Sequence, residues 1–332
     1  MKKLIGLALF LAVLYGALLM ADPSAGSARN HINLAKLIGH YGILCLAVTP
    51  VIITGGIDLS IGAVVGFCVT SLAMLLTDYH WNPHLAVATV LFMGMVIGWI
   101  NGMLVTKLGL QPFVVTLCGL FIYRGLSRWI ANDGIKGLGG TNAFDAYKAI
   151  FHDGDLFGIP KFFVIFLVIA AILAVILHLS IYGRYWLAIG ANEKTAHYSG
   201  IRVDRYKILA YVFCSLLCAM FSVLYLTEYN SAAPSETGNF FELYAIAGAV
   251  LGGVSLRGGE GNVLGVIMGT MILWILPNFT RMWGISDKLQ YTVIGAALLF
   301  GAIVDELLRQ RQKVGAYFLG FVKSVKKLLT RT

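Results

Sequence analysis

The chain has 332 residues, of which 58% are hydrophobic and only 12% are charged, and its formal net charge is +9. A soluble domain carries about 25% charged and about 45–50% apolar residues, so this composition excludes an ordinary soluble protein and indicates an integral membrane protein. No basic surface with interleaved aromatic residues accompanies the positive charge, and we therefore expect no nucleic-acid partner.

Apolar stretches long enough to cross a bilayer recur along the whole chain. A spanning helix needs about 20 largely apolar residues, and only helices can cross without leaving backbone groups unpaired in lipid. We therefore predict an all-α, polytopic membrane protein with eight to ten transmembrane helices. The candidate spans are residues 4–20, 33–54, 60–77, 84–106, 112–131, 160–179, 207–227, 241–255, 262–281 and 288–308. Residues 241–255 are short for a span, and Arg124 and Arg128 fall inside 112–131.

The first stretch resembles a signal peptide, because Lys2 and Lys3 precede an apolar run and small residues follow it. The run covers residues 4–20, which is longer than the usual hydrophobic region of about 7–15 residues in a signal peptide. We therefore predict an uncleaved first transmembrane helix whose N-terminus lies in the cytoplasm.

The distribution of basic residues predicts the orientation. With ten spans and a cytoplasmic N-terminus, 16 of the 25 Lys and Arg residues fall in cytoplasmic segments and six in external loops. Basic residues favour the cytoplasmic side, so both termini are predicted to lie there. The transmembrane domain then covers residues 1–308, with a periplasmic loop at 132–159 and a cytoplasmic loop at 183–205. Residues 309–332 form a basic cytoplasmic tail, either solvated or lying on anionic lipid.

Sequence signatures of an enzyme or a metal site are absent. The chain contains no Gly-Lys dipeptide and hence no phosphate-binding loop of an ATPase, and it lacks the common hydrolase and metalloprotease motifs. All five cysteines lie in apolar segments, where we expect small hydrophobic helix residues rather than disulfides or metal ligands. They are Cys45, Cys68, Cys118, Cys214 and Cys218. We predict a non-enzymatic chain that binds no metal or cofactor itself.

Two glycine-rich strings resemble each other. Residues 55–62 read Gly-Gly-Ile-Asp-Leu-Ser-Ile-Gly and residues 252–259 read Gly-Gly-Val-Ser-Leu-Arg-Gly-Gly. Transporters often contain two related halves with discontinuous helices near the binding site. We expect glycine-rich turns to interrupt the helices there, and whether the two halves are parallel or inverted stays open. The turn residues are Gly55, Gly56, Gly252, Gly253, Gly258 and Gly259.

The cytoplasmic loop 183–205 contains signals for a short helix. Asn192 is a good N-cap, and Glu193 suits the first turn of a helix. Gly200 can end the helix in a left-handed conformation. We therefore predict a short helix over 193–199 outside the bilayer. The alternative is a surface loop that merely joins two spans.

Four sequence motifs resemble those of a known family, and one of them lies in this loop. They are 54–62, 111–117 followed by Tyr123-Arg124-Gly125, 183–202, and 251–262. In this order they resemble the ribose-type permeases of bacterial ATP-binding-cassette importers, over about residues 35–308. The first helix is shorter than in that family, the tail is longer and more basic, and residues 132–159 lack a matching string.

The resemblance implies a multi-component importer in the bacterial inner membrane. A periplasmic binding protein would deliver a monosaccharide, two permease chains (a homodimer or a heterodimer) would form the path, and cytoplasmic ATPase chains would supply ATP and Mg²⁺ chemistry. The cargo alternatives are a nucleoside, a polyol-like signal or a branched amino acid. A secondary transporter or channel is a further alternative, but it would need buried acids for a coupling ion. A membrane enzyme would need a catalytic cluster.

The resemblance and the local pattern together nominate site residues. Coupling to the ATPase is assigned to residues that shape the loop or contact the partner: Gly190, Asn192, Glu193, Ser199, Gly200, Arg202 and Arg205. Asp58 either lies beside the solute path or caps the helix 60–77, and Thr54 and Ser60 share that ambiguity. Neutral polar residues suit an uncharged sugar or helix–helix hydrogen bonds, namely Asn101, Gln111 and Thr116. Arg124 is expected to extend to the external interface.

Overall fold

The computed structural model describes residues 2–139, 144–156, 158–284 and 291–296, with the single residues 286, 289, 299 and 303. Long helices dominate this part of the chain. They are α1 (Lys2–Ala21), α2 (Ala28–Ile53), α3 (Ile61–Thr77), α4 (Pro83–Thr106), α5 (Pro112–Ile130), α7 (Lys161–Ala174) with the π-helical turn η3 (Val175–Leu179), α10 (Val203–Tyr229) and α12 (Val263–Met282).

Short elements join or flank these helices. They are the 3-10 turn η1 (Pro23–Gly26), the helices α6 (Asp145–Phe151), α8 (Ile181–Ala191), α9 (Glu193–Tyr198) and α11 (Phe241–Leu251), and the two-residue strands β1 (Lys136–Gly137), β2 (Asp155–Leu156), β3 (Ile159–Pro160) and β4 (Ser231–Ala232). Strand β1 pairs with β4 and β2 pairs with β3, both antiparallel. In the described residues the strands are only two residues long and helices make up most of the chain, so the predicted all-α membrane architecture is confirmed.

Eight of the ten predicted spans coincide with helices. Among the described residues, six helices are long and apolar enough to cross a membrane, and the apolar parts of α1 and α3 are slightly shorter. The span predicted over 241–255 is wrong as a full crossing, because α11 has only 11 residues. At 1.5 Å per residue it rises about 16 Å, roughly half of the hydrocarbon core. The tenth predicted span lies mostly outside the described residues, and the tail 309–332 lies entirely outside them.

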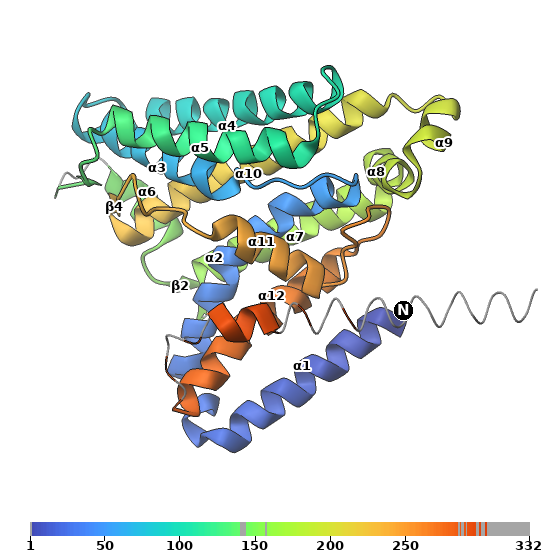
Figure 1. Cartoon of the computed structure of the whole chain (residues 1–332). Coiled ribbons are helices and arrows are strands. Elements are labelled where there is room, and N and C mark those ends of the chain that lie inside the picture. Colours follow the sequence, from blue (N-terminus) through green and yellow to red (C-terminus); the bar gives the residue numbers. More distant parts are fainter. Residues whose placement is uncertain are drawn as a thin grey trace, which may run out of the picture.

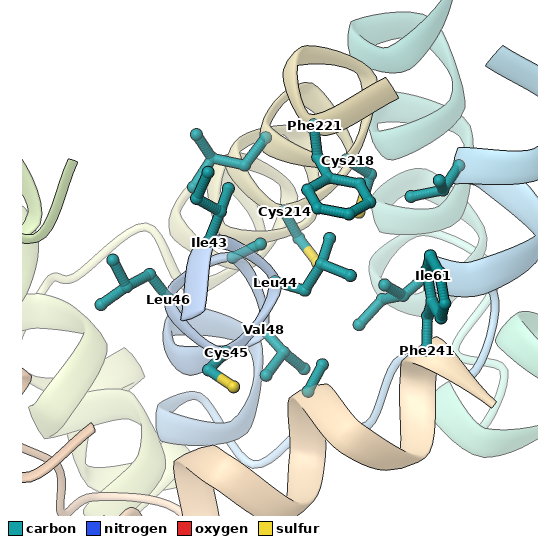
Figure 2. Packing of buried hydrophobic residues seen from close by; sticks show 14 of the residues in the cluster. Ile43, Leu44, Cys45, Leu46, Val48, Ile61, Cys214, Cys218, Phe221 and Phe241 are labelled. Carbon is teal, nitrogen blue, oxygen red and sulfur yellow. The ribbon is translucent and has the colours of Figure 1, made fainter. Parts of the chain in front are cut away.

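Helix α2 occupies the centre of the bundle. Figure 2 shows its residues Ile43 to Val48 surrounded by Cys214 and Phe221 of α10, Ile61 of α3 and Phe241 of α11. Cys45, Cys68, Cys214 and Cys218 are free and buried in this core, whereas Cys118 is free and exposed. The four buried thiols therefore pack as small apolar side chains.

Small residues bring the helices into close contact. Gly94, Gly98 and Gly102 recur every fourth residue of α4, so they form one stripe along the helix. A Cβ on Gly98 would lie 2.4 Å from the carbonyl oxygen of Tyr211, and a Cβ on Gly102 would lie 2.8 Å from the Cα of Ile208. The backbones of α4 and α10 consequently approach through this stripe, which is the usual role of small residues in membrane bundles.

The two ends of the bundle carry different segments. Figure 1 shows α8 and α9 at one end, and β4 and α6 at the other. Lys136 of β1 forms an ion pair of 2.7 Å with Asp78 at the second end and lowers the pKa of the Asp78 carboxyl. Lys107 forms an ion pair of 2.6 Å with Asp204 at the first end. The segments predicted to be external thus lie together, opposite those predicted to be cytoplasmic.

Candidate functional site

A first chain break separates α2 from α3. Thr54 is the C-cap of α2, and its Oγ1 donates a hydrogen bond of 2.9 Å to the carbonyl oxygen of Val51. Gly55 follows with φ +80°, a conformation that glycine adopts without strain. The next helical residue is Ile61, so residues 54–60 form a non-helical segment between two apolar helices. Figure 1 shows this segment between the ends of α2 and α3.

A buried hydrogen-bond network ties this break to the neighbouring helices. Asp58 Oδ1 accepts hydrogen bonds from the amide of Ser60 (2.8 Å) and from its hydroxyl (2.6 Å). Asn101 Nδ2 donates to Ser60 Oγ at 3.2 Å, and the Tyr123 hydroxyl donates to Asn101 Oδ1 at 3.3 Å. The Asp58, Ser60 and Asn101 residues are at most 1% exposed. The network therefore connects the break to α4 and α5, and Tyr123 is a member that the sequence did not single out.

The predicted helix cap is corrected by two positions, from Asp58 to Ser60. Ser60 occupies the N-cap of α3, and Asp58 accepts the amide of Ser60 rather than an amide within the first turn. Thr116 Oγ1 donates to the carbonyl oxygen of Ile57 at 3.2 Å, so it also holds the break. Gln111 is exposed at the N-cap of α5 and makes no side-chain cap bond. A role of these residues in a solute path stays a prediction.

A second break separates α10 from α11. Helix α10 ends at Asn230 in a left-handed conformation, and residues 233–240 form turns before α11 begins at Phe241. We call residues 233–240 the re-entrant segment. It lies against the first turns of α3: a Cβ on Gly62 would be 2.0 Å from the carbonyl oxygen of Gly238. The two breaks therefore meet inside the bundle.

Arg124 holds the re-entrant segment. Its Nη1 donates hydrogen bonds to the carbonyl oxygens of Pro234 (3.1 Å) and Thr237 (2.5 Å). The expectation that Arg124 extends to the external interface is therefore wrong. Non-helical backbone at membrane depth needs hydrogen-bond partners from protein, because lipid supplies none, and here the guanidinium supplies the donors. Glu242 in the first turn of α11 is also buried. A Cβ added to Gly62 would lie 2.5 Å from the Oε2 atom of Glu242.

Three segments meet at the opposite, predicted cytoplasmic end. The Gly259 amide donates a hydrogen bond of 2.9 Å to the carbonyl oxygen of Ile53, the last residue of α2. A Cβ on Gly190 of α8 would lie 1.8 Å from the same oxygen and 2.3 Å from the Gly259 nitrogen. A Cβ on Gly258 would lie 3.0 Å from the nitrogen of Gly55 and 3.0 Å from the Cα of Gly190. We call these four glycines, Gly55, Gly190, Gly258 and Gly259, the glycine junction.

The predicted glycine turns have two different physical causes. Gly253, Gly258 and Gly259 have φ between +76° and +85°, where a side chain would strain the backbone. Gly252 instead has ordinary φ and is required for close approach, because its Cβ would lie 2.5 Å from the carbonyl oxygen of Gly265. Gly56 also has a close neighbour, since its Cβ would lie 2.7 Å from the hydroxyl oxygen of Tyr211.

The predicted short helix of the cytoplasmic loop is confirmed as α9. Asn192 Oδ1 accepts the Thr195 amide at 2.9 Å, which satisfies a free donor of the first turn. Gly200 has φ +82°, and the amide of Ile201 returns to the carbonyl oxygen of Ala196 at 3.1 Å. Both ends of the helix are therefore capped as the residue types indicate.

One side of α9 is anchored and the other is exposed. Ala196 forms a small apolar cluster with Ile189 of α8 and Val203 of α10. Glu193 pairs with Lys207 Nζ at 2.6 Å, while Asn192, Ser199, Arg202 and Arg205 are exposed. Tyr198 is 87% exposed on the same helix, and its only signal in the sequence is an aromatic residue among polar ones. This end of the bundle therefore presents a rigid, partly basic surface.

The chain is similar in sequence to a family of permeases. Residues 30–302 match the family model described as the permease component of the branched-chain amino acid transport system. The chain is 36% identical over 301 residues to the ribose import permease protein RbsC of Bacillus subtilis, with 90% of this chain and 91% of the relative covered. It is 32% identical to RbsC of Escherichia coli K12, with 92% of each chain covered. It is 30% identical to the autoinducer 2 import system permease protein LsrD of Klebsiella pneumoniae, with 83% and 82% covered. No solved structure matches.

Proposed function

Because the chain belongs to the family of branched-chain amino acid transport system permease components, we propose that it is the membrane-spanning permease of an ATP-binding-cassette importer for a monosaccharide. The relatives named above are import permeases for ribose and autoinducer 2, and the identity is higher for the ribose permeases. Their names support a sugar as the cargo over the branched amino acid of the family description. Family membership and the apolar helices together place the protein in the bacterial inner membrane as a multi-pass protein.

The partners are proposed from the same relationship. A separate ATPase chain binds the cytoplasmic end and hydrolyses ATP, a binding protein delivers the solute at the external end, and a second permease chain completes the path. Capped helix α9 is the proposed contact for the ATPase, because its outward side is exposed and its inward side is fixed by Ala196. Arg202, Arg205 and Tyr198 supply exposed basic and aromatic groups there.

One observation carries the proposal: α8 and α9 are joined to the end of α2 and to the turn at 252–262 through Gly190. This residue touches the carbonyl oxygen of Ile53 and the amide of Gly259 without an intervening side chain. Backbone-to-backbone contacts leave little room to slide, so a displacement of α9 would move the end of α2 and the turn at 252–262 together. Rigid-body displacement of packed elements is a common way to transmit a conformational change.

The test is reconstitution of the chain in lipid vesicles with the proposed ATPase and binding-protein partners. We expect ribose-loaded binding protein to stimulate ATP hydrolysis and ribose uptake, and the chain alone to hydrolyse no ATP. Separate vesicles receive autoinducer 2 and leucine in place of ribose. Uptake without added ATPase would contradict the importer, and uptake of leucine alone would contradict the sugar assignment.

The contact surface has its own matched variants. Tyr198→Ala removes an exposed aromatic side chain from α9, and Tyr79→Ala removes one that is 62% exposed at the opposite end of the bundle. Aromatic residues are enriched among the side chains that dominate protein interfaces. We therefore expect Tyr198→Ala to weaken co-purification of the ATPase and Tyr79→Ala to leave it unchanged. Equal co-purification of both variants would remove α9 from the interface.

A further inference from the structure

The re-entrant segment has one buried side and one polar, exposed side. Pro234, Thr237 and Gly238 are buried against α3 and Arg124. Ser235, Glu236 and Asn239 are exposed on the other side, followed by Phe240, which is 50% exposed. Asn239 Nδ2 donates to the carbonyl oxygen of Ser235 at 3.2 Å, which stiffens the turn that presents these three side chains.

This segment lies well inside the bilayer. Its contacts with α3 are at Gly62 and Gly66, where a Cβ would lie 2.0 Å from the Gly238 carbonyl oxygen and 2.6 Å from that of Thr237. Helix α3 ends near Asp78, which pairs with Lys136 at the external end. At 1.5 Å per residue, Gly66 and Gly62 are about 18 and 24 Å along α3 from that end, compared with a hydrocarbon core of about 30 Å.

Lipid is an unsuitable environment for the exposed side. Irregular backbone at membrane depth is tolerated only where protein buries it or water reaches it, and a carboxylate facing hydrocarbon is strongly unfavourable. Glu236 is exposed on such a segment, so its side chain requires water or a polar ligand. The lipid-facing side of α7 shows the contrast: Val168 and Ile172, each 53% exposed, are apolar.

We propose that the exposed side of the re-entrant segment lines the solute path, and that Ser235, Glu236 and Asn239 bind hydroxyl groups of a polyhydroxylated solute there. A carboxylate accepts hydrogen bonds, whereas an amide and a hydroxyl both donate and accept, so the three side chains complement neighbouring sugar hydroxyls. Arg124 is a positioning residue that holds the segment through two of its carbonyl groups. The inference rests on the proposed import of a sugar and names residues of its path.

Water access is tested with variants that carry one added cysteine in a Cys118→Ser background, because Cys118 is the exposed native thiol and the other four are buried. Ser235→Cys, Glu236→Cys and Asn239→Cys are treated with a membrane-impermeant methanethiosulfonate reagent in reconstituted vesicles. The matched control is Ile172→Cys, which lies about 17 Å along α7 from Lys161 and is comparably deep. Only the thiolate reacts, and lipid keeps a thiol protonated.

We expect the three variants of the segment to react at least about tenfold faster than Ile172→Cys, because their thiols would ionise in water. Reaction rates equal to that of Ile172→Cys would overturn the inference. This measurement needs no cargo, so it is independent of whether the unaltered chain imports ribose.

Solute binding is tested by Glu236→Gln and Asn239→Ala in the ribose uptake assay. Loss of a hydrogen bond to a charged group changes affinity by about tenfold or more, so we expect the half-saturating concentration of ribose-loaded binding protein to rise by about that factor for Glu236→Gln. Ile172→Ala, which shortens an exposed apolar side chain of α7 away from either end of the bundle, is the control and should change nothing. An unchanged half-saturating concentration in both segment variants would exclude contact with the solute.

The positioning role of Arg124 can be tested with a measurement that distinguishes it from a simple loss of folding. Arg124→Lys keeps the charge but loses the planar donor group that reaches two carbonyl groups. We expect the cysteine at 236 to label at a different rate in this background, with the chain still inserted and monodisperse. Arg128→Lys, which alters an exposed arginine paired with Asp133, is the control. Identical labelling in both backgrounds would leave Arg124 without the proposed role.

Discussion

The amide of Gly259 donates a hydrogen bond of 2.9 Å to the carbonyl oxygen of Ile53, across more than half of the chain. This bond joins the turn that precedes α12 to the end of α2. Gly190 lies against the same two groups, so the loop 183–205 meets both glycine-rich stretches at one point. The similarity of those two strings in sequence is therefore accompanied by direct contact in space, and the contact lies beside the proposed ATPase surface.

Gly190→Ala should push apart the segments that meet at the glycine junction. The added methyl group would lie 1.8 Å from the carbonyl oxygen of Ile53, and overpacking of this kind costs about 1–3 kcal/mol. We expect a lower melting temperature and loss of solute-stimulated ATP hydrolysis. Gly125→Ala is the control, because a Cβ on Gly125 of α5 meets nothing within 4 Å, and alanine favours a helix by about 0.5–1 kcal/mol. Equal behaviour of the two variants would show that the junction tolerates separation.

Gly200→Val should distort the end of α9 without any steric clash. A Cβ at this position meets nothing within 4 Å, but φ is +82°, where a side chain costs about 1–2 kcal/mol. Because Gly200 is exposed, the expected distortion comes from backbone strain and not from crowding. Gly200→Asn should be milder, since asparagine visits left-handed conformations. We expect uptake and stimulated ATP hydrolysis to fall together in the valine variant. Loss of uptake alone would place the loop elsewhere in the mechanism.

Glu193→Arg should uncouple the ATPase while the chain still folds. The substitution breaks the ion pair with Lys207 and places a positive charge at the start of α9, where the helix dipole favours an acid. An exposed ion pair contributes at most about 1 kcal/mol, so insertion and stability should persist. Adding Lys207→Glu restores an ion pair and should recover part of the stimulated ATP hydrolysis. Full activity of Glu193→Arg in vesicles would show that this charge has no part in coupling.

Asn101→Ala should destabilise the first break. It removes the acceptor of the Tyr123 hydroxyl and a donor to Ser60, both inside the bundle. A buried polar group without a partner costs about 1–3 kcal/mol, which thermal unfolding in detergent can measure. Gln111→Ala is the control, because Gln111 is exposed and makes no cap bond. A loss of uptake far beyond the loss of stability would favour a place for Asn101 in the solute path.

The orientation can be measured with thiol reagents in intact cells. Asp133→Cys lies in the predicted external loop and Lys194→Cys on α9, and both side chains are exposed. We expect an impermeant reagent to label Asp133→Cys in intact cells, and Lys194→Cys only after the membrane is opened. The prediction follows from the excess of basic residues on the α9 side. Labelling of Lys194→Cys from outside would invert the topology and move the ATPase contact to the other end.

Local features could be predicted because neighbouring residues decide them. Asn192 caps an amide three residues away, and Gly200 ends the same short helix, so α9 depends on fewer than ten consecutive residues. The long spans follow from apolar runs that no soluble environment would tolerate. The same runs cannot show how far a helix extends, which is why α2 begins at Ala28 instead of residue 33 and why α11 ends at Leu251 instead of residue 255.

The sequence by itself thus determined the class of the protein, most of its spans and the capped helix α9, because composition, run length and local hydrogen bonds are sufficient for these. Only the tertiary structure decided the contacts between distant segments. Arg124 reads as an interfacial residue until its partner Thr237, 113 positions away, is placed beside it. The contacts of Gly62 with Gly238 and of Ile53 with Gly259 likewise depend on how the helices pack across the bundle. A glycine in the sequence can indicate a close contact, but it does not identify the backbone segment that makes the contact.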